Sequence, residues 1–64
     1  MENIVGTKKM PEGILVMWGA GSGVQSDTFT FQELIDMKVN TLDLLDRPAA
    51  YQVDPKAHTI VPKR

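Results

Sequence analysis

Hydrophobic and polar positions divide the chain into short segments with different periods. Residues 14–18 (Ile-Leu-Val-Met-Trp) form a continuous apolar run, which is typical of a strand buried on both faces. Residues 28–31 (Thr-Phe-Thr-Phe) alternate polar and aromatic side chains, the period of a half-buried strand. Between them, glycine occupies every second position of residues 19–23. The simplest pairing is therefore a long hairpin that turns in this glycine loop.

A helical segment is predicted over residues 31–47. Thr30 precedes Glu33 by three positions, the spacing of a capping box in which each residue satisfies a backbone amide of the other. Residues 40–41 (Asn-Thr) offer a second N-cap, and Pro48 ends the helical pattern. The segment is either one helix interrupted near the second cap or two short helices, and the β-branched residues around that cap favour the interruption.

Two more strands are predicted at residues 50–53 and 58–61, joined by a type I turn over 54–57 (Asp-Pro-Lys-Ala). The expected fold is α+β, a small antiparallel sheet in the order β-β-α-β-β with the interrupted helical segment on one face. Residues 1–12 are expected to form an N-terminal arm, and residues 13–64 a single domain. The predicted core consists of Leu15, Met17, Phe29, Phe31, Leu34, Ile35, Leu42, Leu45, Val53 and Ile60.

Composition narrows the class of protein. Of the 64 residues, 42% are hydrophobic and 23% are charged, as in a globular domain. So short a chain buries a smaller fraction of its surface than a larger domain does, and we therefore expect a dimer or a higher homo-oligomer. The chain has no cysteine and one histidine, which excludes disulfides and cysteine-ligated zinc. No metal and no cofactor are expected.

Charge and hydropathy also limit the partners. The formal net charge of −1 argues against broad electrostatic binding of nucleic acid, which requires a basic face. No apolar run approaches the roughly 20 residues that cross a bilayer. The first residues lack the apolar centre of a signal peptide. The expectation is a cytoplasmic protein that does not contact a membrane.

The glycine loop is the first candidate site. It has the spacing Gly-x-Gly-x-Gly, but Val24 stands where the dinucleotide fingerprint has its third glycine, and no helix follows at once. A hairpin tip that contacts a partner fits better. Trp18 is expected in the core, although tryptophan is also enriched at binding hot spots. The candidate contact residues are Trp18, Gly19, Gly21, Ser22 and Gly23.

Two other constellations are weaker. His58 could join Ser22 or Ser26 and an aspartate in a hydrolytic triad, but no nucleophile-elbow motif frames either serine. We interpret His58 as a partly exposed strand residue and predict that the protein is not an enzyme. Residues 32–47 could form a helix-turn-helix, yet their second half is acidic and would be repelled by phosphates.

The function favoured by these patterns is that of a non-enzymatic protein-interaction module. Its composition is that of a stand-alone accessory or inhibitor protein of the kind that viruses of bacteria encode. The first alternative is a binder of a nucleotide-like anion, held by residues 19–23 at a subunit interface. The second alternative is a weak nucleic-acid binder of the helix-turn-helix kind.

Overall fold

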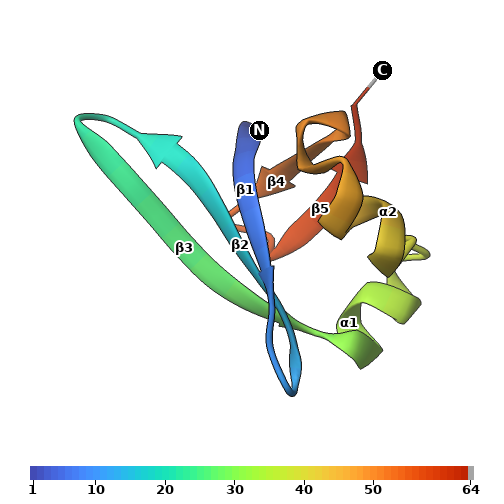
Figure 1. The fold of residues 1–64 in the computed structure, drawn as a ribbon. Coiled ribbons are helices and arrows are strands. Elements are labelled where there is room, and N and C mark those ends of the chain that lie inside the picture. The colour runs from blue at the N-terminus through green and yellow to red at the C-terminus, as the bar shows by residue number, and fades with distance from the viewer. Residues whose placement is uncertain (64) are drawn as a thin grey trace.

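The computed structural model describes residues 1–63. It contains one five-stranded antiparallel sheet and two short α-helices (Figure 1), which confirms the α+β class and the antiparallel sheet. Along the chain the elements are β1 (Glu2–Lys9), β2 (Gly13–Ala20), β3 (Gly23–Thr30), α1 (Phe31–Asp36), α2 (Thr41–Asp46), the 3₁₀ turn η1 (Pro48–Ala50), β4 (Tyr51–Asp54) and β5 (Thr59–Pro62).

The strands lie in the order β3-β2-β1-β4-β5. Strands β1 to β3 follow one another, and β4 returns after the helices to lie beside β1, which is a Greek-key arrangement. Residues 2–9, expected in an arm, thus form the central strand. Sequence patterning missed this strand because a bulge between Ile4 and Gly6 breaks its alternation.

The β2–β3 hairpin is longer than predicted. The two strands pair from Gly13 opposite Thr30 to Ala20 opposite Gly23, so the connection shrinks to the two-residue turn Gly21-Ser22. Gly21 has a φ of 61°, and a positive φ at the first residue alone is the geometry of a type II′ turn. This end of the hairpin projects away from the rest of the molecule (Figure 1).

Strand β2, expected to be buried on both faces, buries only the face that carries Ile14, Val16 and Trp18. Phe29 is fully buried as expected, and Ile14 lies directly opposite it, so both side chains share the inner face. Leu15 and Met17 therefore face outward and are half-buried, contrary to prediction. A continuous apolar run carries no period, and a shift of one residue exchanges the two faces. The buried hydrophobic residues are Ile4, Ile14, Val16, Trp18, Phe29, Leu34, Val39, Leu44, Tyr51, Val53 and Ile60.

The predicted interruption of the helical segment is present, and both predicted caps form. Thr30 accepts from the amide of Glu33, whose carboxylate accepts from the amide of Thr30 in return. Asn40 caps α2 by accepting from the amide of Asp43. The segment therefore folds as two helices rather than one.

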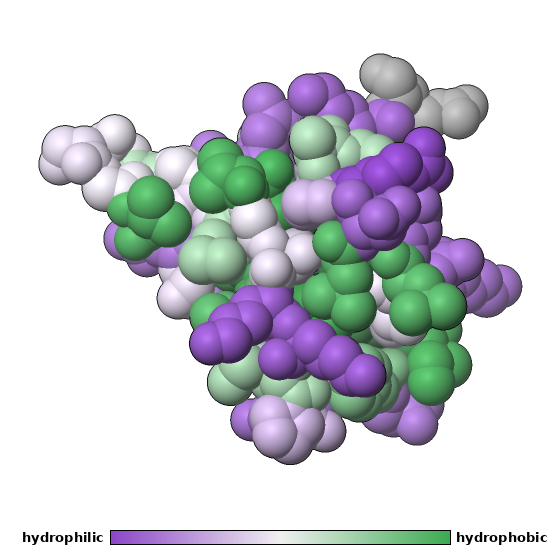
Figure 2. Space-filling view, viewed as in Figure 1, coloured by the Kyte–Doolittle hydropathy of each residue, from purple (hydrophilic) through white to green (hydrophobic). Residues whose placement is uncertain are grey.

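Each helix has six residues and buries only one of them, Leu34 in α1 and Leu44 in α2. Ile35 and Leu42, predicted in the core, are 62% and 76% exposed. Ile35 lies one position after Leu34, and Leu42 lies two positions before Leu44. Around the helix axis they are therefore rotated roughly 100° and 200° from the buried leucines. Phe31 and Leu45 are partly buried and pack against the core. Apolar surface accordingly gathers over the two helices in Figure 2.

The predicted turn between the last two strands is present, one position later than expected. The carboxylate of Asp54 accepts from the amides of Lys56 and Ala57, which fixes the turn. His58, predicted in a strand, belongs to this turn and has a φ of 52°.

Gly13 provides a test of the β2–β3 register. A Cβ atom at Gly13 would lie 1.9 Å from the carbonyl oxygen of Phe29, whereas a Cβ at Gly19 would meet no heavy atom within 4 Å. We expect Gly13→Ala to lower the free energy of unfolding by about 3 kcal/mol, the upper end of the range for overpacking. Gly19→Ala, the matched control, should leave it nearly unchanged. Urea denaturation measures both, and equal effects would contradict the register.

Candidate functional site

The glycine tip of the β2–β3 hairpin is an open structure. Gly19 and Gly23 lie within the strands, and only Gly21 and Ser22 form the turn. A Cβ atom at Gly19, Gly21 or Gly23 would meet no heavy atom within 4 Å. No other part of the protein therefore packs against the backbone of these glycines. A two-residue turn with paired flanks does not enclose an anion as a wide glycine loop does.

Trp18 lies at the base of this tip. Its side chain is 5% exposed and belongs to the core, as the preferred interpretation of the sequence had it. The accessible part of the candidate site is therefore Gly19, Gly21, Ser22 and Gly23. Val24, which sequence reasoning did not single out, adds an apolar side chain that is 67% exposed.

The backbone of β3 forms an outer edge of the sheet. The amide of Gly13 donates to the carbonyl of Met10 across the β1–β2 turn, so the polar backbone groups of Gly13 face β1 and not β3. Bonded and non-bonded pairs alternate along antiparallel strands. The even-numbered residues of β3, from Val24 to Thr30, therefore direct their N–H and C=O groups away from β2.

Side chains already occupy the amides in one half of this edge. The amide of Thr28 donates to Oδ1 of Asp27, and the amide of Thr30 donates to Oε1 of Glu33, each at 2.9 Å. Nothing within residues 1–63 accepts from the outward amides of Val24 and Ser26. We call residues 24–26 the open edge.

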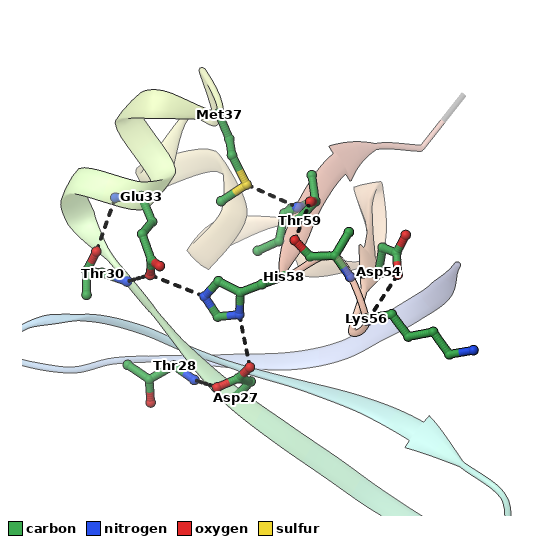
Figure 3. A network of polar contacts seen from close by, with 11 residues as sticks. Asp27, Thr28, Thr30, Glu33, Met37, Asp54, Lys56, His58 and Thr59 are labelled. Carbon is green, nitrogen blue, oxygen red and sulfur yellow. Dashed lines mark hydrogen bonds and ion pairs between the residues drawn. The ribbon is translucent and has the colours of Figure 1, made fainter.

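The other outer edge of the sheet, β5, is closed. The amide of Ile60 points outward and donates to the sulfur of Met37 at 3.3 Å (Figure 3). Two positions later, on the same side of the strand, Pro62 has no N–H at all. Unoccupied outward amides of the two outer strands are thus concentrated at the hairpin end of β3.

His58 joins the β4–β5 turn to β3 and α1 (Figure 3). Its Nδ1 lies 3.0 Å from Oδ2 of Asp27, and its Nε2 lies 3.2 Å from Oε1 of Glu33. The ring stacks on Phe29 with a centroid distance of 4.0 Å and an interplanar angle of 11°. A protonated ring donates to both carboxylates, whereas a neutral ring donates to one.

This arrangement, the His58 clasp, is not the triad considered from the sequence. Both ring nitrogens contact carboxylates, and neither contacts Ser22 or Ser26. The clasp brings the two outer strands toward each other across the sheet. Within residues 1–63 it links the β4–β5 turn to β3 and to α1.

Hydrogen bonds also shift the pKa of two carboxyl groups. The backbone amide of Thr30, and after it the ring of His58, lower the pKa of Glu33. Arg47 and then the hydroxyl of Tyr51 lower the pKa of Asp43, both at 2.7 Å. The hydrogen bond from Tyr51 to Asp43 also connects the start of β4 to α2.

Several other kinds of site find no support in the part of the chain that the structure describes. No group of three or more histidine or carboxylate side chains is arranged to hold a metal ion among residues 1–63. None of the helices in this range has the length and apolar character to span a bilayer. Comparison with protein-family models, with curated proteins and with solved structures finds no match.

Sequence reasoning missed the open edge for a physical reason. Residues 23–27 (Gly-Val-Gln-Ser-Asp) show no clear strand period, and their importance comes from the order of the strands in the sheet. The capping-box spacing of Thr30 and Glu33 was the one local signal that predicted an occupied amide at the end of β3.

The lowered pKa of Glu33 predicts how stability depends on pH. Because the folded state depresses this pKa below 4.5, the carboxylate stabilises the fold above about pH 4.5, and this contribution is lost as the pH falls through the folded value. We expect the stability of Glu33→Gln to fall less on acidification than that of the wild type. Urea midpoints from pH 7 to pH 3 measure this.

Glu12→Gln is the control for removal of one negative charge, since the side chain of Glu12 is exposed and makes no hydrogen bond in the described structure. Parallel pH profiles for the wild type and Glu33→Gln would show that the contacts of Glu33 with Thr30 and His58 do not stabilise the folded state.

Proposed function

We propose that the protein is a non-enzymatic interaction module that acts by contact, and that its open edge adds an extended segment of a partner protein as a further strand. The observation that carries the proposal is the pair of outward amides at Val24 and Ser26, which have no acceptor within residues 1–63. In strand addition, backbone hydrogen bonds provide affinity and the alternating side chains provide specificity.

The position of the open edge favours this function. The hairpin projects from the body, so an added strand meets the hairpin alone (Figure 1). Val24 and Ser26 share the outer face with Gly19 and Met17, their opposite neighbours on β2. An incoming strand would therefore gain apolar contact with the exposed Val24. Figure 2 shows apolar surface on the projecting hairpin.

The occupied half of β3 supports a specific site rather than general edge association. Exposed strand edges promote aggregation, and charged side chains on an edge oppose it. Asp27 and Glu33 place carboxylates over the amides of Thr28 and Thr30. A partner strand is thus limited to the hairpin end, where residues 23–26 carry no charge.

The two alternative functions gain less from the geometry. A nucleotide-like anion would need a cradle at residues 19–23, where the chain makes a two-residue turn. Small Greek-key barrels bind nucleic acid by stacking bases on exposed aromatic rings. Here Trp18, Phe29 and Tyr51 are at most 7% exposed, and Phe31 is partly buried against the core. Helix α2 carries Asp43 and Asp46.

The biological setting follows from composition and is part of the same proposal. A mildly acidic chain without cysteine suits the reducing cytoplasm. An accessory or inhibitor protein that works by occupying a partner surface needs only a stable contact element, which the hairpin provides.

A proline substitution tests the outward amides of the open edge without disturbing the pairing of β3 with β2. Ser26→Pro removes an outward amide and no bond to β2, and edge strands tolerate such a proline. Ser26→Ala, the matched control, keeps the amide. Peptides selected from a random display library on the wild-type protein should bind Ser26→Ala equally well and bind Ser26→Pro at least about tenfold more weakly.

Circular dichroism and amide NMR spectra establish that both variants keep the fold. Selected peptides that bind Ser26→Pro as tightly as the wild type would show that the open edge is not the contact. A selection that enriches no peptide would count against strand addition by a peptide segment.

A further inference from the structure

We infer that the partner that fits the open edge is a second copy of this chain, with β3 of one copy antiparallel to β3 of the other about a two-fold axis at Gln25. The inference rests on the proposed function, because it assigns an occupant to the same edge. It is carried by the pattern of free and occupied backbone groups along β3 and β5.

The free groups are self-complementary. The two residues whose outward amides are open, Val24 and Ser26, flank Gln25 symmetrically. A two-fold axis at Gln25 places Val24 of each copy opposite Ser26 of the other. In an antiparallel pair, residues that face each other in this way exchange N–H and C=O bonds. The pairing therefore satisfies each open amide with an open carbonyl.

Neighbouring registers fit less well. A shift of two residues in one direction would set Val24 opposite Thr28, whose amide is already bonded to Asp27. A shift of two in the other direction would set Ser26 opposite Ser22, which lies in the turn and not in an extended strand. The axis at Gln25 thus uses both amides that β3 leaves free and neither of those that its side chains occupy.

Charge and side-chain placement agree with this register. Residues 23–26 are uncharged. Asp27 of one copy would face Gly23 of the other, four positions from the second Asp27 and therefore about 13 Å from it along the strand. That separation exceeds the Debye length of about 8 Å at physiological ionic strength. The two Val24 side chains would be diagonal neighbours on the outer face.

The closed edge at β5 determines how far association proceeds. Ile60 donates to Met37, and Pro62 has no amide, so β5 offers no outward donor at either position. Pairing of the two β3 strands consumes the open edge of both copies in one isologous contact. Association therefore stops at a dimer with one continuous sheet and does not continue into a fibre.

Gln25 gives a test specific to a second copy, because the two-fold axis places it opposite itself. Gln25→Glu or Gln25→Lys alone would set like charges against each other, whereas a mixture of the two variants would pair opposite charges. We expect sedimentation equilibrium to show a wild-type dimer and at least tenfold weaker association of each variant. The equimolar mixture should recover the dimer.

Ser26→Pro should weaken the dimer at least tenfold, and Ser26→Ala should not. Hydrogen exchange gives an independent readout that does not require a substitution. The amides of Val24 and Ser26 should become protected as protein concentration rises through the dimerisation range.

Three results would overturn the inference: a monomer at all concentrations, a dimer that Ser26→Pro leaves intact, or a charge-variant mixture that associates no better than its components. A monomer that binds selected peptides through the Ser26 amide would refute the second copy as partner and leave the proposed function standing. A monomer that binds no such peptide would refute both.

Discussion

The pairing of β1 with β4 is the contact on which the rest of the fold depends. It consists of Glu2 opposite Val53 and Asn3 opposite Gln52, with a further hydrogen bond of 3.0 Å between the side chains of Gln52 and Asn3. This short ladder connects the three-stranded β1–β3 unit to the β4–β5 hairpin. Without it, the β4–β5 hairpin would be at best marginally stable in water, and the β1–β3 unit would lose the two strands that extend its sheet. Val53, a member of this ladder, and Ile4, which follows Asn3 in the chain, both belong to the buried core.

The His58 clasp acts at the other side of the same core. The sheet curls so that a turn next to β5 reaches β3, although these strands lie at opposite ends of the strand order. Stacking on Phe29 places the ring over a fully buried residue, and the two carboxylates orient it from either side. Asp27 serves twice, since one oxygen contacts His58 and the other occupies the amide of Thr28. Closure of the sheet and protection of its edge thus depend on a shared carboxylate.

The sequence predicted those features that local chemistry determines. The capping box at Thr30, the cap at Asn40 and the turn after Asp54 each need only residues a few positions apart, and all three are present. Features that depend on distant residues were not predictable. The inner face of β2 follows from its register with Phe29, and the strand at residues 2–9 follows from its position between β2 and β4. The open edge of the candidate site depends on strand order in the same way.

The central position of β1 has a consequence for synthesis on the ribosome. Strand β1 leaves the exit tunnel before both of its neighbours in the sheet: β2 follows directly, but β4 begins only at Tyr51, and the Gln52–Asn3 side-chain bond spans 49 positions. Contacts so distant in sequence form slowly, since a long loop must close first. Until β4 emerges, the nascent chain presents the β4-facing side of β1 as a second unpaired edge. Productive folding therefore requires that β4 pair with β1 before that edge meets another strand.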